Sequence, residues 1–168
     1  MGRLQMTTDA NQTEFRLRGH RVPAIEKMDI DYIAGRICKI LKANKSSFSP
    51  SKIGLFINSL EENGIHVDPV DDDEWIDAAR ATVDPSTGFI YMPNWLYNNL
   101  NRSEPEALRI FLHELGHIFL CHRPLLHFSD KNAVEIEDSE WQADTFADSI
   151  INQLGLPKQG RQLEFKHF

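Results

Sequence analysis

One short segment, HELGH at residues 113–117, most constrains what this chain can fold into, because it lies inside a mostly apolar run. The run spans residues 107–120 and contains no proline. Such a segment is typical of a buried helix. We predict a helix from about residue 104 to about residue 122, with Ser103 and Glu106 forming a capping box at its start.

The spacing of the polar residues in this segment indicates a metal site. Residues four positions apart project from one face of a helix, so His113 and His117 can share a metal ion. Glu114 lies about 100° further round the helix, where its carboxylate can reach a water on that metal without binding the metal itself. This arrangement is typical of a zinc hydrolase.

Zinc in hydrolytic sites usually takes three protein ligands and leaves one position for water, so a third ligand is needed. A metzincin would have glycine and histidine three and six residues after His117, but Leu120 and Arg123 stand there. Cys121 continues the i+4 row, yet each step drifts about 40° from the metal face. A cysteine in this position more often packs as a small apolar residue at the end of a helix. We therefore expect the third ligand further along the chain.

Two carboxylates and two alanines follow the spacing i, i+3, i+4, i+7 of one helix face: Glu140, Ala143, Asp144 and Ala147. The alanines allow close approach to a neighbouring helix. If that neighbour carries the HELGH motif, Glu140 can be the third zinc ligand, and Asp144 can accept the free N–H of a ligand histidine. Glu137 is the reserve ligand. A solvated acidic face is the alternative interpretation, but it does not explain the alanines.

Together these segments give the chain a resemblance to the ImmA/IrrE family of zinc metallopeptidase domains. The resemblance covers residues 30–156 and rests on the HELGH helix, on the Arg-Ile-Phe-Leu stretch at 109–112, and on the pattern E-x-x-A-D-x-F-A at 140–147. It implies an α+β fold, a zincin-like metallopeptidase domain with helices packed on a small mixed sheet.

The resemblance also implies roles for individual residues. Those that match the zinc ligands of the family are His113, His117 and Glu140. Glu114 matches the catalytic glutamate, and Zn²⁺ is the implied cofactor. Position 144 is often Asn in this family, so Asp144 looks more like the Glu-x-x-x-Asp arrangement of gluzincins.

Hydrolysis of a carbonyl compound needs a hydrogen-bond donor for the negative charge that develops on the oxygen. The candidates for such oxyanion or substrate contacts are His127, His122 and Tyr91, and their spacing does not choose among them. The likeness to gluzincins suggests that an extended peptide binds by strand addition at one edge of the sheet. Residues 88–93 are our candidate edge, with a core strand as the alternative.

Apolar residues at helical spacing predict two earlier helices, one at residues 29–43 and one capped by Ser49 or Ser51 and ended by Gly64. Three short strands are expected, at residues 65–68, 79–83 and 89–92. The helix pair carries few basic residues and the formal net charge is −7, so no direct contact with nucleic acid is expected.

At 168 residues and 41% hydrophobic, the chain is long enough for one domain with a core. We expect an N-terminal extension at 1–28, the zincin-like domain at 29–157 and a C-terminal tail at 158–168. No apolar run reaches the length of a membrane span, and the N-terminus lacks the apolar core of a signal peptide. Two cysteines form no disulfide framework, so a cytoplasmic location is the simplest inference.

The sequence thus predicts a zinc-dependent metallopeptidase. The resemblance implies site-specific cleavage of a regulatory protein, such as a transcriptional repressor or an antitoxin-like partner, in a stress response or a phage or mobile-element switch. The alternative is a zinc-containing module of the same fold that controls a partner without cleaving it. Glu114 favours catalysis, because a structural site needs no general base. Hydrolysis of a non-peptide amide would use the same chemistry.

Overall fold

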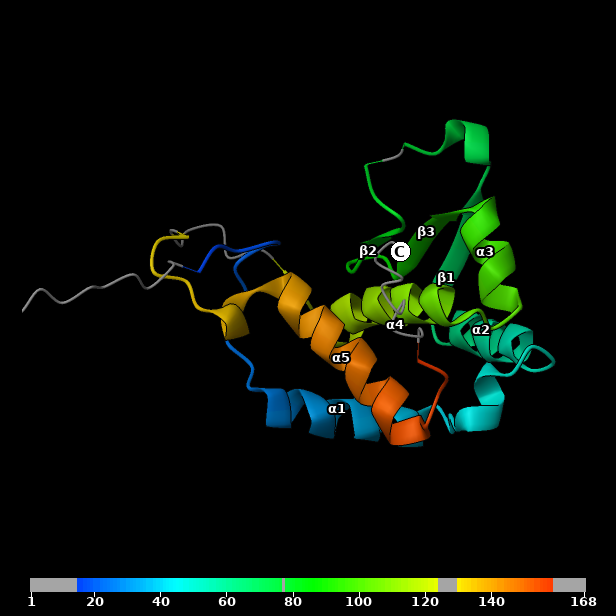
Figure 1. The fold of residues 1–168 in the computed structure, drawn as a ribbon, viewed down its shortest axis with the longest axis horizontal. Helices are drawn as coiled ribbons and strands as arrows, with labels where there is room; N and C mark the ends of the chain where they lie inside the picture. Colours follow the sequence, from blue (N-terminus) through cyan, green and yellow to red (C-terminus); the bar gives the residue numbers. More distant parts are fainter. Residues whose placement is uncertain (1–14, 77, 124–129, 159–168) are drawn as a thin grey trace, which may run out of the picture.

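A computed structural model describes residues 15–76, 78–123 and 130–158 of the chain. Within these ranges the fold is α+β, with five α-helices and a three-stranded mixed sheet. Figure 1 shows α4 at the centre, with the sheet on one side and α5 on the other, while α1 packs against the far side of α5. No helix in these ranges has the length and apolar character needed to cross a membrane.

The α-helices are α1 Lys27–Ile40, α2 Ile53–Glu62, α3 Asn94–Asn101, α4 Pro105–Phe119 and α5 Ser139–Leu154. Three short 3₁₀ turns join them: η1 Lys45–Phe48, η2 Asp72–Glu74 and η3 Glu135–Glu137. The predicted helices are confirmed with shifted ends, and α3 was not predicted. Gly64 has a φ of +82°, the left-handed conformation that follows a helix end, as expected for α2. The predicted serine cap of α2 is wrong, because its N-cap position is Lys52.

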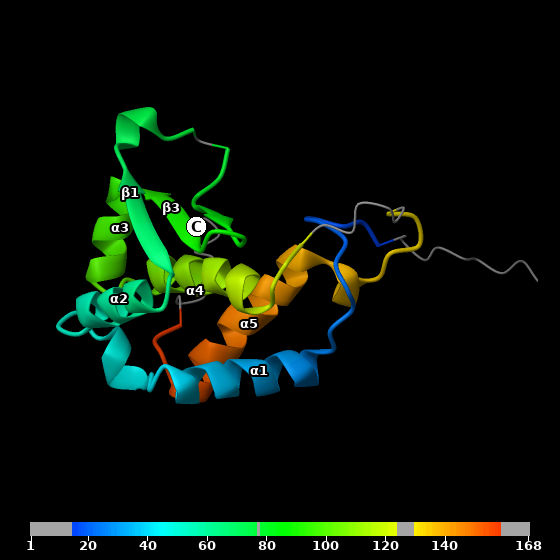
Figure 2. The ribbon, with the colours of Figure 1, turned by 180° about the vertical axis from the view of Figure 1, so that it is seen from behind.

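The strands are β1 His66–Val70, β2 Thr82–Asp84 and β3 Phe89–Pro93, in the order β1-β3-β2. β3 pairs in parallel with β1 and antiparallel with β2. The prediction of residues 88–93 as an open edge is therefore wrong: β2 folds back through the turn at 84–88 and covers that edge. Seen from behind, β1 lies beside β3, with α2 and α3 at this end of the molecule (Figure 2).

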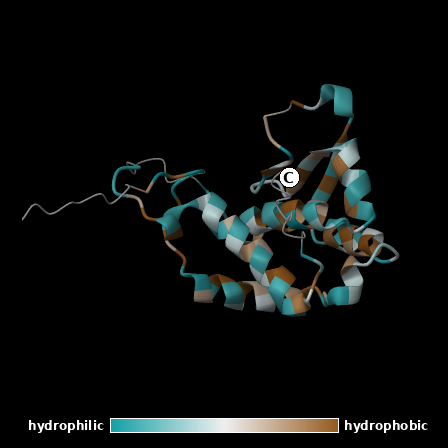
Figure 3. Ribbon diagram, in the orientation of Figure 1, coloured by the Kyte–Doolittle hydropathy of each residue, from teal (hydrophilic) through white to brown (hydrophobic). Residues whose placement is uncertain are grey.

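The hydrophobic core lies where α4 meets the sheet and α5. Hydrophobic residues follow α4, α5 and the strands, and hydrophilic ones cover η2 (Figure 3). The largest fully buried side chains include Phe111 and Leu115 of α4, Phe146 of α5 and Met92 of β3. Burial of each such side chain contributes about 1.5–3 kcal/mol. This packing fixes α4, and the motif that it carries, between two layers.

α4 and α5 approach most closely at Gly116. A Cβ added to Gly116 would lie 3.2 Å from the Cα and O atoms of Ala143 and from Cβ of Phe146. Ala143 and Ala147 have no exposed surface. The predicted stripe of small residues is therefore confirmed as the face of α5 that meets the HELGH helix.

The start of α4 differs by one residue from the predicted capping box. Glu104 is the N-cap, and its carboxylate accepts hydrogen bonds from two N–H groups of the first turn. Ser103 has a φ of +56° and donates its hydroxyl to the carbonyl of Phe48 instead. Pro105 explains the shift, because proline favours the first helical position and so places the cap at Glu104.

Candidate metal centre and its cleft

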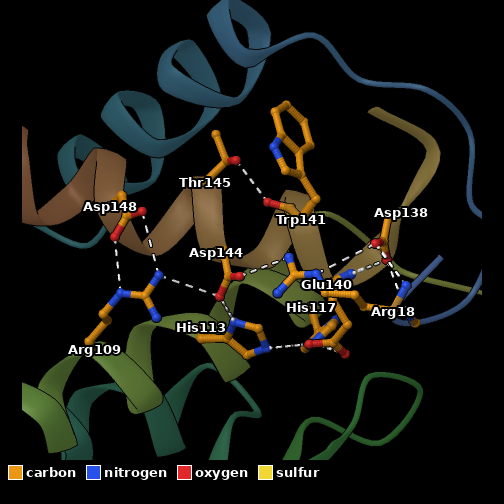
Figure 4. Close-up of polar contacts among 11 residues, drawn as sticks. Arg18, Arg109, His113, His117, Asp138, Glu140, Trp141, Asp144, Thr145 and Asp148 are labelled. Atoms are coloured by element: carbon orange, nitrogen blue, oxygen red, sulfur yellow. Dashed lines mark hydrogen bonds and ion pairs between the residues drawn. The ribbon is translucent and has the colours of Figure 1, made fainter. Parts of the chain in front are cut away.

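α4 and α5 bring the three predicted metal ligands together. Figure 4 shows His113 and His117 pointing from α4 toward Glu140 in the first turn of α5. His113 Nε2 lies 2.9 Å from Glu140 Oε2 and 3.2 Å from His117 Nε2, which is 3.4 Å from Glu140 Oε1. One ligand atom from each residue lies within 4.8 Å of the other two.

These donors suit a metal ion. Two imidazole nitrogens converge on one point with a carboxylate, the combination that zinc takes in many hydrolytic sites. The two Nε2 atoms face each other, and two bare imidazole nitrogens repel unless a proton or a cation lies between them. The residues therefore fit zinc.

Asp144 holds the other side of His113, one turn along α5 from Glu140. Asp144 Oδ1 lies 2.8 Å from His113 Nδ1, and Arg18 and Arg109 contact the same carboxylate at 3.0 and 3.5 Å. Burial raises the pKa of Asp144, but the hydrogen bond from His113 and the neighbouring arginines lower it further than burial raises it. The ionised carboxylate accepts the Nδ1 proton and leaves Nε2 for a metal.

His113 and Glu140 lie close enough to share a proton. Burial lowers the pKa of His113, but hydrogen bonds to Asp144 and Glu140 outweigh burial and raise that pKa to about 9. The hydrogen bond from His113 and the nearby ring of His117 lower the pKa of Glu140. His113 and Glu140 thus form an ion pair that a metal must replace.

Glu114, the predicted catalytic glutamate, lines the same cleft as the three ligands. Its side chain is on α4 and the residue is only 8% exposed. Burial raises the pKa of Glu114, and the positive charge of nearby His113 lowers it less. A raised pKa brings this carboxylate closer to neutral pH, where a general base works best.

The cleft measures about 570 Å³ and is built from four parts of the chain. α4 and the start of α5 contribute the candidate ligands and Glu114. β2 and its flanking residues form one wall, and His20 from the segment before α1 forms another. Since β2 is the edge strand beside the cleft, an open strand edge lies next to the metal position.

The segment before α1 is fastened to the start of α5 by its backbone. The N–H groups of Arg18 and Gly19 donate to the carboxylate of Asp138 at 3.0 and 3.1 Å. His20 donates its N–H to Ser139 Oγ and accepts from the N–H of Ser139, both at 3.0 Å. A Cβ on Gly19 would collide with Ser139 and Glu140. These backbone hydrogen bonds place His20, an exposed residue, at the wall of the cleft.

Of the three predicted donors for the carbonyl oxygen, the two that lie among the described residues are not available to a substrate in the cleft. His122 is buried and uses both ring nitrogens, one on His117 and one on Gln142, so neither is left for a substrate. Burial lowers its pKa to about 4. Tyr91 is on the central strand β3 and is not among the residues that line the cleft. His127 lies outside the described residues.

The reserve ligand and the helix-end cysteine are both away from the metal position. Glu137 forms an ion pair with Arg21 at 2.7 Å and accepts from the N–H of Val134. Cys121 is exposed just after α4, with a φ of +54°. Neither belongs to the ligand group formed by the described residues.

Sequence reasoning missed four residues that shape the site: Arg18, His20, Asp138 and Gln142. Arg18 and His20 contact residues of α5 that are more than a hundred positions away in the chain, and no local sequence pattern predicts such a contact. For Asp138, the signal was its position just before a helical stripe, where a capping aspartate is common.

No family model, curated protein or solved structure matches this chain. The assignment of the site therefore depends on its own geometry and chemistry.

Proposed function

We propose that this protein is a zinc-dependent metallopeptidase with a zincin-like domain of the ImmA/IrrE type. The observation that carries the proposal is the convergence of His113, His117 and Glu140 within 4.8 Å, in a cleft that Glu114 also lines. A purely structural zinc site needs four protein ligands and no adjacent base. Three ligands beside a buried glutamate instead favour a site that works on a substrate.

Each residue then has a defined task. Zinc, when bound by these residues, would supply Lewis-acid chemistry that polarises a carbonyl and eases the loss of a proton from water near neutral pH. Glu114 accepts that proton on its carboxylate as the new C–O bond forms. Glu114 then gives the same proton to the leaving amine nitrogen when the C–N bond breaks, which restores its starting state.

His20 is the donor that we propose for the developing charge on the carbonyl oxygen. Among the described residues, it is the only cleft-lining imidazole that is neither a candidate ligand nor hydrogen-bonded through both ring nitrogens. Its backbone is fixed by Ser139, one residue before Glu140. A hydrogen-bond donor to the developing oxyanion contributes about 10²–10³ in rate in other acyl-transfer sites.

The open edge of β2 supports a peptide as the substrate. The carbonyl of Gly88 accepts from the N–H of His66 at 2.9 Å, so Gly88 and, by alternation, Ile90 turn backbone groups toward β1. Val83, the partner of Ile90, is then at a position that is not hydrogen-bonded to β3. Residues alternate along an antiparallel pair, which turns the N–H and C=O of Val83 toward the open edge. An extended peptide can pair with these groups and so lie along the cleft. A small non-peptide amide would have no use for such an edge.

We further propose that the substrate is a regulatory protein, such as a transcriptional repressor or antitoxin-like partner, inside the cytoplasm. The support is the resemblance carried by the HELGH helix and the E-x-x-A-D pattern at 140–144.

The proposal is tested by metal analysis and proteolysis on four purified proteins: wild type, Glu140→Gln, Glu114→Gln and Glu135→Gln. Glu135 is exposed on η3 and serves as the matched control. We expect about one zinc per chain in wild type, with a strong loss in Glu140→Gln. Glu114→Gln should keep zinc but lose cleavage of candidate repressors by about 10²–10⁴-fold. The control should match wild type in both.

Two results contradict the proposal. Freshly purified wild type without zinc would remove the metal site. Zinc retained with no cleavage of repressors, or of a mixed peptide library read by mass spectrometry, would favour the non-cleaving regulatory module instead.

A further inference from the structure

A buried polar chain leads from His117 away from the cleft to the backbone. His117 Nδ1 and His122 Nδ1 are 2.8 Å apart, and His122 Nε2 is 2.8 Å from Gln142 Oε1. The amide nitrogen of Gln142 then donates to two carbonyl oxygens, of Pro23 at 2.9 Å and of Ile136 at 2.7 Å. The three side chains are all buried.

The two carbonyl groups fix the direction of every hydrogen bond in this chain. A carbonyl oxygen only accepts, so both N–H groups of Gln142 are engaged and its Oε1 must act as the acceptor. His122 therefore carries its hydrogen on Nε2. The ring of His122 is buried between His117 and Gln142, where the neutral imidazole is favoured, so its Nδ1 is then bare.

A bare Nδ1 on His122 requires a donor, and His117 Nδ1 is the atom that faces it. With its hydrogen on Nδ1, His117 has a lone pair on Nε2. That atom points at His113 Nε2 and Glu140, the position of the candidate metal. The tautomer needed for metal binding is thus set by two backbone carbonyls through two intervening side chains.

We propose that His122 and Gln142 are positioning residues that hold His117 in its metal-binding tautomer and orientation. This inference depends on the proposed metal site, and it gives the two ligand histidines different supports. His113 is held by the ionised carboxylate of Asp144, whereas His117 is held by a relay of one imidazole and one amide. The relay also ties the site to the segment before α1 through Pro23, and to η3 through Ile136.

The first test needs no variant. Long-range ¹⁵N–¹H correlation spectra of the metal-free wild type report which ring nitrogen of each histidine carries hydrogen. We expect the Nδ1–H form for His117 and the Nε2–H form for His122. The opposite assignment for His122 would overturn the proposal, because the direction of the chain would then be reversed.

The second test compares zinc affinity, by competition with a chelator, in His122→Ala, His122→Asn and Gln142→Leu. His66→Ala is the matched control, since His66 lies on β1 and does not line the cleft. We expect a loss of about 10–100-fold in zinc affinity for His122→Ala and Gln142→Leu, the range seen when such supporting groups are removed. Asparagine offers an acceptor oxygen in place of Nδ1, so His122→Asn should recover much of the loss. The control should bind zinc like wild type.

The outcomes separate this inference from the proposed function. A wild type that binds no zinc overturns the metal site and with it the positioning role. Wild-type zinc affinity in both His122→Ala and Gln142→Leu overturns only the relay. An equal loss in His122→Ala and His122→Asn also counts against the relay, because it indicates a packing defect rather than a missing acceptor.

Discussion

His113 lies between the carboxylates of Asp144 and Glu140, so a proton and a metal ion compete for one imidazole. In the metal-free folded protein the pKa of His113 is raised from 6.5 to about 9. The folded state therefore holds this proton more tightly than the unfolded chain does. The contribution of His113 to the free energy of unfolding is complete below pH 6.5 and is lost as the pH rises through about 9.

We expect the melting temperature of the metal-free protein to fall between pH 6.5 and about 9. Scanning calorimetry in the presence of a chelator measures it, with His113→Gln as the comparison, which should show a shallower fall. In wild type, excess zinc should abolish this fall in melting temperature with pH, since a bound metal replaces the proton. Equal slopes in the two metal-free proteins would rule out His113 as the group responsible.

His20 is the residue for which the proposal predicts a purely kinetic effect. His20→Ala should lower kcat by about 10²-fold while leaving KM and zinc content near those of wild type, because the imidazole acts on the developing charge. Steady-state kinetics on a cleaved peptide, with zinc analysis, provide the measurement. Arg16→Ala, an exposed change on the same segment, is the control. A change in KM alone would instead assign His20 to substrate binding.

At the scale of secondary-structure elements, Asp138 joins two parts of the molecule. It is the N-cap of α5, accepting from the N–H of Glu140, and it also accepts from Arg18 and Gly19. Its side chain is completely buried. One carboxylate thus starts the helix that carries a candidate ligand and fastens the segment that carries His20.

Asp138→Ala should lower the free energy of unfolding by about 1–3 kcal/mol, because it removes a cap and leaves buried N–H groups without an acceptor. Urea denaturation followed by circular dichroism measures the change. Asp73→Ala, an exposed acidic residue on η2, is the control and should be near neutral. If Asp138→Ala were as stable as this control, the buried hydrogen bonds of Asp138 would contribute nothing to folding.

The open edge of β2 gives a second prediction at this scale. Val83→Pro removes the N–H that faces the edge without removing a bond to β3, which edge strands tolerate. Loss of one such hydrogen bond to substrate, worth about 1.4 kcal/mol, corresponds to a roughly tenfold rise in KM for an extended peptide. Steady-state kinetics provide the measurement. Val83→Ala controls for the side chain, and an equal KM in both variants would argue against strand addition.

At the scale of the whole molecule, a metal would join α4 to α5 across the centre of the fold. If zinc binds only the folded state, a free zinc concentration of about 100 times the dissociation constant should stabilise that state by about 2.7 kcal/mol. Thermal unfolding with zinc and after chelation measures the shift. Glu140→Gln should show little of it, since it lacks one of the three candidate ligands. An identical shift in that variant would place zinc elsewhere.

The sequence predicted those parts of the fold that have a regular spacing of apolar residues within one element. The buried helix around HELGH and the alanine stripe at 140–147 follow from spacing within one element, and the stripe even indicated which helix it meets. α3 was missed because its two buried residues, Leu96 and Leu100, give too short a pattern. Residues 88–93 were wrongly predicted as an edge because the pairing of β2 with them was not foreseen. β2 has only three residues, too few to show the alternation that identifies a strand.

The candidate site divides in the same way. His113, Glu114 and His117 follow from one helical turn, and Glu140 follows from the stripe. The position of His20 depends on a contact with Ser139, more than a hundred residues away in the chain. Gln142 does not touch a candidate ligand and acts only through His122. Contacts of this kind arise from tertiary packing, which periodicity does not encode.

The close approach at Gly116 bears on which ion the site would accept. Gly116 lies one residue before His117, and Ala143 lies three residues after Glu140, so α4 and α5 are packed closely beside these candidate ligands. A side chain at residue 116 would have to push α5 away from α4. Zinc forms bonds of about 2.0–2.2 Å to such ligands, against about 2.3–2.6 Å for calcium. A larger residue at position 116 would therefore move Glu140 away from the two histidines, and the longer separation would suit the short bonds of zinc less well.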